Sequence, residues 1–302
     1  MEYIKAKTIV NRNKKNSWFG YEYTMNIYRG CNQGCIYCDS RCDCYKVKDF
    51  DTVKAKENAL MIIRNNLRSK TSRGVICTGS MSDPYNIFEK DLLLTRNALQ
   101  LIHAYKFGVG IITKSNLITR DIDILMDISK QATAMVKITI TTADDSLARK
   151  IEPGAPSPSE RFSALKQLTD NGLFAGVLLM PLLPFIQDDE ENIANIVERA
   201  AESGAKFIYP RFGVTLRGNQ KEWYYNKLDK TFPGLKQQYA NLYKDKVYCN
   251  SPNSRRLYAY FKRKCIEYNI LFDMEDIIKE SRKGFRYGQL SFFDLHSGDM
   301  IL

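Results

Sequence analysis

The chain has 302 residues, 44% of them hydrophobic, and a formal net charge of +11. This length suffices for one large α/β domain with a globular core, and no apolar run reaches the roughly 18 residues that a membrane span needs. The two histidines, His103 and His296, exclude a mechanism built on several histidines. The basic charge favours a polyanionic partner such as nucleic acid, or simply gives solubility.

Short β-rich runs alternate with segments of helical periodicity through most of the chain. Strands are predicted at residues 23–27, 74–78, 109–113, 136–142, 174–180 and 207–210. Helices are predicted at residues 58–67, 92–105, 122–128, 160–168 and 192–201. From the second strand onward, the spacing is that of repeated strand–helix units, which predicts an α/β fold with a parallel sheet curled into a partial (β/α)6 barrel. Functional residues are expected at the carboxyl ends of its strands.

The pattern changes after residue 213, where helices and aromatic residues follow without further strand–helix units. Helices are predicted at residues 220–227, 234–243, 254–267 and 273–283. We therefore expect two parts: a partial barrel with an N-terminal lead-in over residues 1–215, and a mainly helical, basic and aromatic extension over residues 216–302.

Three cysteines lie within eight residues in the spacing C-x3-C-x2-C, at Cys31, Cys35 and Cys38. A [4Fe–4S] cluster has four irons and is usually held by four thiolates. Three thiolates on one short loop hold three corners and leave the fourth iron open. Because an open metal position marks a reactive site, the spacing indicates a catalytic cluster.

Other interpretations of the cysteines exist. Cys42 and Cys44 follow closely and could complete a four-cysteine zinc knuckle, although the run lacks two separated pairs. A disulfide framework is not needed in a chain of this length, and the first ten residues contain no apolar core of a signal peptide. The eight cysteines therefore suggest a reducing cytoplasm, with Cys42 and Cys44 as free thiols and with Cys249 and Cys265 unassigned.

The cysteine loop resembles the signature of the radical S-adenosylmethionine superfamily, C-x3-C-x-aromatic-C, with Tyr37 as the aromatic residue. The resemblance implies that the open iron binds the amino and carboxylate groups of S-adenosylmethionine. Reductive cleavage then gives a 5′-deoxyadenosyl radical that abstracts hydrogen from a substrate. The resemblance also implies an electron donor such as flavodoxin or ferredoxin.

Polar residues follow several predicted strands. The second strand runs into Cys77-Thr-Gly-Ser-Met-Ser-Asp-Pro-Tyr85, and Lys114 follows the third, where it is well placed to pair with a carboxylate. Thr139 and Thr141 share one face of the fourth strand, although threonine is also simply a good strand former. Further along, Glu152 and Arg161 would either form an ion pair with each other or contact a ligand.

These segments together resemble the spore photoproduct lyase-related branch of the superfamily. The resemblance implies that Lys114 holds the cofactor carboxylate, and that Ser80 or Ser82, and Thr139 or Thr141, line the cofactor site; the choice within each pair stays open. Tyr37 and Arg161 complete the expected cofactor-binding set.

By the same resemblance, Cys77 would match a hydrogen-donating cysteine on the second strand of the lyase, because Thr78 and Ser82-Asp83 follow it here as Thr and Ser-Asp do there. The thiol could return hydrogen to a substrate radical, or it could be a small buried hydrophobic residue.

Two features bear on the partner. The segment that contains Arg255, Arg256 and Tyr258 mixes basic and aromatic residues, as protein surfaces that bind nucleic acid do. The same pattern also fits the solvated side of an ordinary helix. The five residues from Gln289 to Phe293 resemble the motif with which bacterial replication proteins dock on the sliding clamp, although packing of Leu290, Phe292 and Phe293 back on the barrel is the interpretation we prefer.

Two function classes follow. The first is a lyase-like radical enzyme, acting on DNA or another nucleic acid in lesion repair or modification. The second is a non-catalytic, zinc-binding nucleic-acid module.

Overall fold

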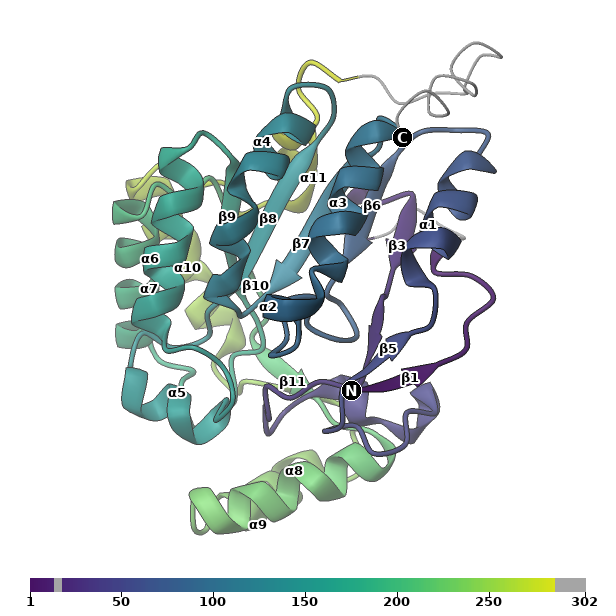
Figure 1. The fold of residues 1–302 in the computed structure, drawn as a ribbon. Helices are drawn as coiled ribbons and strands as arrows, with labels where there is room; N and C mark the ends of the chain where they lie inside the picture. The colour runs from purple at the N-terminus through teal and green to yellow at the C-terminus, as the bar shows by residue number, and fades with distance from the viewer. Residues whose placement is uncertain (14–17, 286–302) are drawn as a thin grey trace.

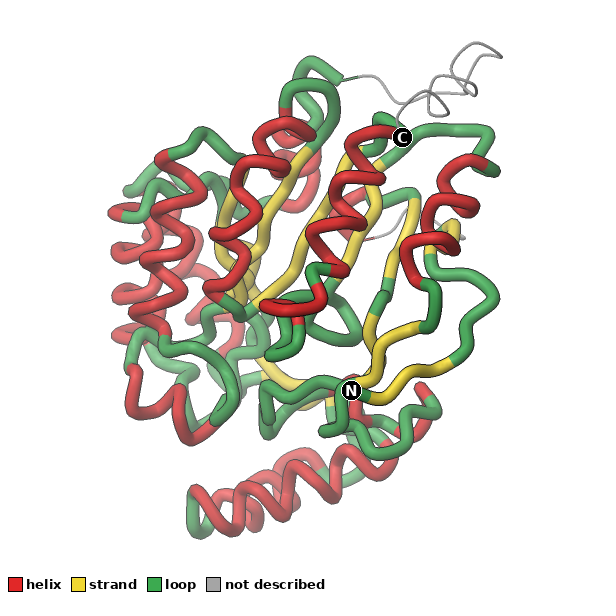
Figure 2. The backbone as a smooth tube through the Cα atoms, in the orientation of Figure 1, coloured by secondary structure: helices red, strands yellow, loops and turns green. Residues whose placement is uncertain are grey.

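The structure, a computed structural model, describes residues 1–13 and 18–285 and is built around a seven-stranded sheet (Figures 1 and 2). The strand order is β10-β9-β8-β7-β6-β3-β2. Strands β3 and β6 to β10 are parallel, and β2 pairs antiparallel with β3 at the edge. The strands are β2 (Val10–Arg12), β3 (Tyr23–Met25), β6 (Val75–Thr78), β7 (Gly108–Thr113), β8 (Ala134–Thr139), β9 (Phe174–Leu179) and β10 (Ile208–Pro210). The six predicted strands and the partial barrel are thus confirmed.

Five helices cover the outer face of the sheet, each at a predicted place (Figure 1). They are α1 (Ala59–Arg68), α3 (Leu94–Ala104), α4 (Ile122–Ser129), α6 (Pro158–Asp170) and α7 (Glu190–Glu202). Their apolar faces are buried against the sheet, as Leu99 and Ile102 of α3 illustrate. Helix α6 begins at a capping box, in which Ser157 and Glu160 bond each other's backbone amides, with Pro158 in the first turn.

The inner face of the sheet is closed near the amino ends of its strands. The short helix η1 (Trp18–Gly20) and α11 (Met274–Ser281) bring Phe19 and Ile277 against Tyr21 and Phe207. The Thr133 hydroxyl, just before β8, donates to the carbonyl of Ser281 at 3.1 Å. Because this end is filled, the opposite edge of the sheet is the one open to a ligand.

The C-terminal part contains the four predicted helices, in α8 (Gly218–Thr231), α9 (Leu235–Tyr243), α10 (Ser254–Glu267) and α11. Helix α10 buries Leu257, Phe261 and Cys265 in the same core as α7. The division at residue 215 stays a prediction. The segment from Gln289 to Phe293 lies outside the described residues.

Several short elements escaped sequence prediction. Strands β11 (Gly213–Thr215) and β12 (Tyr248–Asn250) form an antiparallel pair, and β1 (Glu2–Ile4), β5 (Lys54–Lys56) and β4 (Tyr28–Arg29) form a small second sheet. The short helices are α2 (Glu89–Leu92), α5 (Asp145–Ile151), η2 (Asp39–Arg41), η3 (Asp43–Tyr45) and η4 (Asn116–Asp121). Strands of two or three residues are too short to show an alternation of apolar and polar side chains. Within residues 1–13 and 18–285, no helix combines the length and apolar character of a membrane span.

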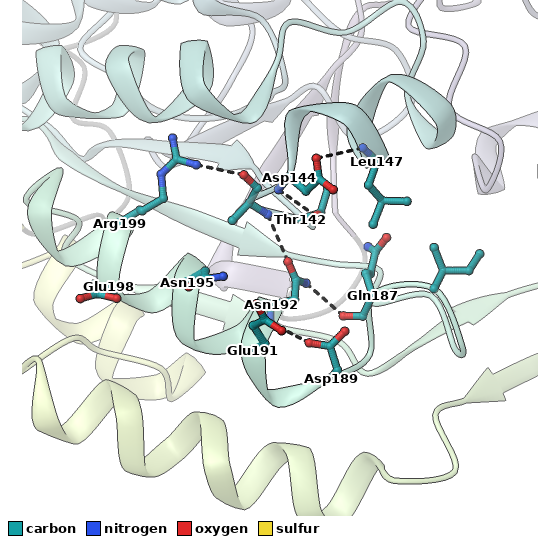
Figure 3. Close-up of a pocket in the computed structure, with 12 residues that line it drawn as sticks. Thr142, Asp144, Leu147, Gln187, Asp189, Glu191, Asn192, Asn195, Glu198 and Arg199 are labelled. Carbon is teal, nitrogen blue, oxygen red and sulfur yellow. Dashed lines mark hydrogen bonds between the residues drawn. The ribbon is translucent and has the colours of Figure 1, made fainter.

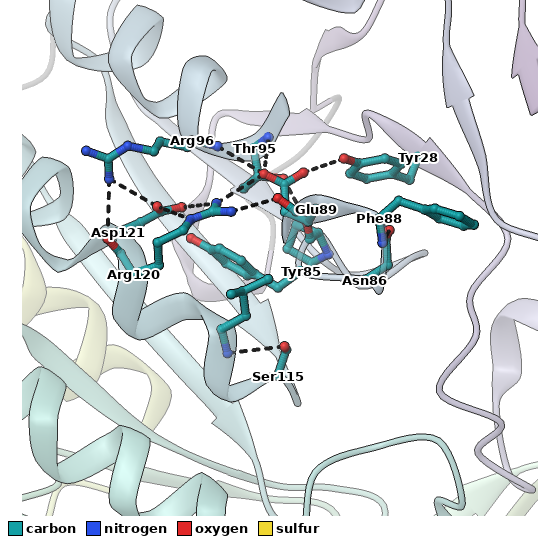
Figure 4. A network of polar contacts seen from close by, with 12 residues as sticks. Tyr28, Tyr85, Asn86, Phe88, Glu89, Thr95, Arg96, Ser115, Arg120 and Asp121 are labelled. Atoms are coloured by element: carbon teal, nitrogen blue, oxygen red, sulfur yellow. Dashed lines mark hydrogen bonds and ion pairs between the residues drawn. The ribbon is translucent and has the colours of Figure 1, made fainter. Parts of the chain in front are cut away.

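A buried polar network ties β4 to the outer helices (Figure 4). The Glu89 carboxylate accepts from the Tyr28 hydroxyl, from the Thr95 amide at 2.9 Å and from the Arg120 guanidinium at 3.1 Å. Arg120 also pairs with Asp121, at 2.7 Å from Nε. Since Tyr28 lies three residues before Cys31, the network fixes the start of the cysteine loop.

We predict that Glu89→Ala lowers the free energy of unfolding by about 3 kcal/mol, because it leaves the buried Tyr28 hydroxyl and Thr95 amide without their acceptor and removes one of the two carboxylates that pair with Arg120. Urea denaturation followed by circular dichroism measures the change. Asp127→Asn, which breaks only the exposed pair with Lys130, should cost less than about 0.5 kcal/mol. An equal loss in both variants would contradict the role given to Glu89.

Candidate active site

The cysteine loop is held in place by its own backbone. Gly30 has a φ of +79°, and a Cβ atom there would lie 2.3 Å from the carbonyl oxygen of Thr52. The Cys31 amide donates to the Phe50 carbonyl at 2.8 Å, and the Ile36 amide donates to the Ile151 carbonyl at 2.9 Å. Only glycine fits such a close backbone approach at a positive φ. The loop therefore starts and turns at fixed points.

Cys31, Cys35 and Cys38 line one cavity of about 100 Å³ at the carboxyl edge of the sheet. Residues that follow three neighbouring strands share the lining: Gly79, Ser80, Ser82 and Asp83 after β6, Thr113 and Lys114 at the end of β7, and Thr139 of β8. Gly79 lies so close to β7 that a Cβ atom would fall 1.8 Å from the carbonyl oxygen of Ile112. The topology thus brings the thiols, hydroxyl groups and an ammonium group together.

Asp83 lines this cavity and accepts several hydrogen bonds there. The sequence did not predict it as a site residue. Its carboxylate accepts from the Thr113 hydroxyl at 2.6 Å, the Lys114 amide at 2.9 Å and the Tyr85 amide at 3.0 Å. Gln33, within the cysteine loop, donates to it at 3.3 Å. One buried carboxylate therefore links the cysteine loop to the ends of β6 and β7. The Ser-Asp-Pro turn after β6 was the only available signal.

Glu152 forms a second buried centre behind the loop. It accepts a hydrogen bond from the Tyr37 hydroxyl, pairs with Arg161 at 2.5 Å, and lies 4.0 Å from the Lys114 ammonium. Burial raises the pKa of Glu152, but Arg161 and Lys114 outweigh burial and leave that pKa lowered. The ion pair between Glu152 and Arg161, one of the two alternatives from the sequence, is present.

Arg161 itself lies behind the site. Its guanidinium donates to the carbonyls of Thr139 at 3.0 Å and Pro156 at 2.8 Å, so it supports the end of β8 from below the cavity lining. Lys114, in contrast, lines the cavity and lies over the Tyr37 ring at 5.6 Å. Among the residues that line this cavity, Lys114 is the one with a cationic side chain, so it is the partner available to an anionic group bound there.

The three thiols suit a cationic metal cluster. Burial raises the pKa of Cys31, Cys35 and Cys38 to about 11 each, so the thiolate forms need positive charge to exist at neutral pH. An iron cluster supplies that charge when it binds. In the described part of the chain, no three His, Cys, Asp or Glu side chains converge on a point suited to a single metal ion. Three thiols on one loop fit three corners of such a cluster.

A second cavity, of about 370 Å³, adjoins the first and shares Cys38, Ser40 and Ser80 with it. Its far wall is formed by Met180 and Pro181 after β9, by Arg211, and by the β11–β12 pair with Tyr248. The Arg211 guanidinium lies 5.5 Å from the centre of the Tyr248 ring, and Tyr248 is 63% exposed. This cavity therefore lies directly beside the thiol cavity and is the larger of the two.

A third cavity, of about 400 Å³, lies between the β8 end and α7 (Figure 3). Its polar side chains mostly serve the local backbone. Asn192 accepts from the Ala143 amide and donates to the Gln187 carbonyl, while Asp144 and Asp189 cap the starts of α5 and α7. It contains none of the residues predicted for the site.

The remaining predicted residues are placed as follows. Ser80 lines both cavities, while the Ser82 hydroxyl donates to the Gly30 carbonyl. Thr141 is buried and lies outside the cavity lining. Cys77 is buried among Tyr21, Met135 and other inner-face side chains, two residues before Gly79.

The prediction that Cys42 and Cys44 are free thiols was wrong, because the two form a disulfide. The turn between η2 and η3 brings their sulfurs together. Cys249 and Cys265 are buried in apolar clusters.

Comparison with known proteins identifies the class. The model of the radical S-adenosylmethionine superfamily matches residues 25–197. An uncharacterized protein of Mycobacterium tuberculosis is 29% identical over 248 residues, or 80% of this chain and 73% of the relative. An uncharacterized protein of Methanocaldococcus jannaschii is 36% identical over 190 residues, or 62% of this chain and 69% of the relative.

Solved structures of spore photoproduct lyase share the fold. A mutant form superposes with a TM-score of 0.66 at 13% identity, covering 88% of this chain and 78% of the lyase. The lyase in complex with a dinucleoside spore photoproduct gives a TM-score of 0.64 at 14% identity, covering 84% and 76%.

The chain therefore belongs to the radical S-adenosylmethionine superfamily, since the family model matches more than half of its length. Membership makes the protein a radical S-adenosylmethionine enzyme with a [4Fe–4S] cluster and S-adenosylmethionine as cofactors. The predicted enzyme class is confirmed, and the alternative of a non-catalytic zinc module is not retained.

We predict that Glu152→Gln lowers the free energy of unfolding by about 3 kcal/mol, because it leaves Arg161 buried without an anion. Urea denaturation checks this. As a control, Asp170→Asn removes the exposed pair with Lys166 and should cost below about 0.5 kcal/mol. If Glu152→Gln were as mild as the control, the buried ion pair would not hold the loop.

Proposed function

We propose that this enzyme uses its cofactors to abstract hydrogen from a nucleic-acid substrate, with DNA as the first candidate, in a lesion-repair or modification reaction of lyase type. The observation that carries the proposal is the pair of adjoining cavities, one lined by the three thiols and the other by Arg211 and Tyr248. A guanidinium and an exposed aromatic ring suit a phosphate and a base. The net charge of +11 supports a polyanionic partner.

Cys31, Cys35 and Cys38 would hold the cluster, and the cofactors when bound supply a 5′-deoxyadenosyl radical. We assign Lys114 to the carboxylate of S-adenosylmethionine, because its ammonium lines the thiol cavity. We favour Ser80 over Ser82, because both line that cavity but the Ser82 hydroxyl is bonded to the Gly30 carbonyl, and we favour Thr139 over Thr141, because Thr141 lies outside the lining. Arg161 and Tyr37 would act by positioning, through Glu152.

The chain's own residues would also exclude water from the reacting atoms. Met180, Pro181 and Val214 place apolar surface around the larger cavity, next to Tyr37 and Cys38. Such surface protects a reactive intermediate from side reactions. Cys77 as a hydrogen donor, a cytoplasmic location and docking on a sliding clamp stay predictions.

The radical chemistry is tested by reconstituting the protein with iron and sulfide without oxygen, then adding dithionite and S-adenosylmethionine. Wild type should yield 5′-deoxyadenosine by chromatography, and Cys35→Ala should not, because it removes one of three cluster ligands. A wild type that assembles a cluster but yields no 5′-deoxyadenosine would refute the proposal.

Lys114→Ala should weaken binding of S-adenosylmethionine about 10- to 100-fold, because it removes a charged partner of the carboxylate. Equilibrium dialysis measures the affinity, and the visible absorption of the cluster should stay unchanged. Lys150→Ala, an exposed lysine of α5, is the matched control. Unchanged binding in the Lys114 variant would remove Lys114 from the cofactor site.

Arg211→Ala should weaken binding of a single-stranded oligonucleotide and reduce the slope of log affinity against log salt by about one, as expected for one lost phosphate contact. Fluorescence anisotropy across a salt series gives both numbers. Lys166→Ala on α6 removes an equal charge outside the cavity and should leave the slope unchanged. Loss of affinity with an unaltered slope would speak against a phosphate contact.

A further inference from the structure

A basic pocket of about 250 Å³ lies on the surface beside the cysteine loop. It is lined by Arg29, Lys46, Lys48 and Lys54, together with Ile4, Val47 and Thr52. Four lining residues are cationic and none is acidic. We call this set the β4–β5 basic pocket, after the two strands that supply Arg29 and Lys54.

The positive charge of the pocket is only partly neutralised. Lys54 pairs with Glu2 at 2.7 Å, and the Arg29 guanidinium is turned toward the Lys46 carbonyl rather than toward a carboxylate. Lys46 and Lys48 are both exposed, and their ammonium groups form no ion pair within residues 1–13 and 18–285. Burial lowers the pKa of the neighbouring Lys56, and the positive charge of Arg29 adds to that effect. The pocket is thus a local concentration of positive charge.

The pocket and the thiol cavity have no lining residue in common, but a short stretch of backbone connects them. Arg29 lies two residues before Cys31, and the segment from Phe50 to Thr52 contacts the loop directly through the Cys31 amide and the Gly30 Cα. The thiols line their own cavity together with Ser80 and Lys114. The small sheet of β1, β5 and β4 supplies Ile4, Lys54 and Arg29 to the pocket, and Figure 1 shows β1 and β5 near the N-terminus. A partner seated there would approach the cluster ligands without entering either cavity.

We propose that the β4–β5 basic pocket docks an acidic one-electron carrier protein, which reduces the cluster through the backbone at Gly30 and Cys31. The inference rests on the proposed function, because a radical S-adenosylmethionine enzyme needs an electron donor. One electron leaves the carrier and enters the cluster; no bond forms and no proton need move. Mobile lysine charges around the contact favour fast, salt-sensitive encounters with an acidic surface.

A nucleic acid suits this pocket less well than an acidic protein. Three of the four cations are lysines, which act as point charges, and the only arginine has a hydrogen bond to a backbone carbonyl. The lining contains no aromatic ring on which a base could stack. In contrast, Arg211 and Tyr248 offer such a pair at the substrate cavity. Electron delivery also has to continue while substrate and cofactor fill the other side.

The test uses the reconstituted enzyme and two acidic probes, a flavodoxin reduced to its hydroquinone and a reduced ferredoxin. The double variant Lys46→Glu/Lys48→Glu changes two exposed charges of the pocket. The control, Lys262→Glu/Arg263→Glu, makes the same change on the exposed face of α10. Calorimetry at low and high salt measures binding, and stopped-flow bleaching of the cluster absorption measures reduction.

We expect the pocket variant to bind at least one carrier about 10-fold or more weakly at low salt and to be reduced correspondingly slowly, with wild-type behaviour in the control. Dithionite is small and needs no docking surface, so it should still support 5′-deoxyadenosine formation by the pocket variant. The two proposals are thus tested separately. A wild type that forms no 5′-deoxyadenosine with dithionite refutes the proposed function. A pocket variant that is active with dithionite but is reduced slowly by the carrier supports docking at the pocket.

Three results would overturn the docking proposal. The first is that neither carrier binds or reduces the wild type. The second is equal loss in the pocket and control variants, which would indicate a general effect of charge. The third is weaker oligonucleotide binding in the pocket variant with unchanged carrier binding, which would assign the pocket to a nucleic-acid backbone.

Discussion

The buried carboxylate of Glu152 is the interaction on which the site depends. It brings together Tyr37 of the cysteine loop, Arg161 of α6 and Lys114 after β7. A carboxylate with 1% of its surface exposed is tolerated only when its charge is compensated, so each partner must be present before the others are stable. The pair with Arg161 supplies the main compensation, because Lys114 is farther away and partly exposed. Lys114 therefore keeps an ammonium available to a ligand, while its orientation is still set by the buried anion.

Asp83 plays the same part on the opposite side of the thiols. It collects two amides and a hydroxyl from the ends of β6 and β7, and the Gln33 side chain from the loop. Three strands that lie far apart in the chain thus deliver their ends to one place, and two carboxylates lock them to the cysteine loop. Parallel sheets make this possible because all their carboxyl ends meet at one edge.

The sequence allowed the sheet, its outer helices and the cysteine loop to be predicted, because these depend on local pattern. The strand at residues 109–113 and the helix at residues 254–267 follow from periodicity alone. Ser80 and Ser82 could not be distinguished in this way, since their different placement depends on the carbonyl of Gly30, fifty residues away. Arg211 and Tyr248 meet through the β11–β12 pairing, which two strands of three residues cannot reveal. The disulfide of Cys42 and Cys44 depends on the turn between two short helices, which no periodicity shows.

The cysteine loop borders two surfaces of different character, a cavity suited to a cofactor and substrate and a basic pocket suited to a protein partner. On its inner side the thiols face small polar groups and then a cavity with an apolar rim, which suits a cofactor and a substrate that must be kept from water. On its outer side lies a concentration of lysines, which suits brief contacts in water. The two surfaces come close at Gly30 and Cys31, where glycine at a positive φ lets the segment from Phe50 to Thr52 approach the loop backbone directly. A side chain at residue 30 would separate the layers and move the first thiol away from Asp83 and the cavity. The glycine is thus as much a part of the site as the cysteine that follows it.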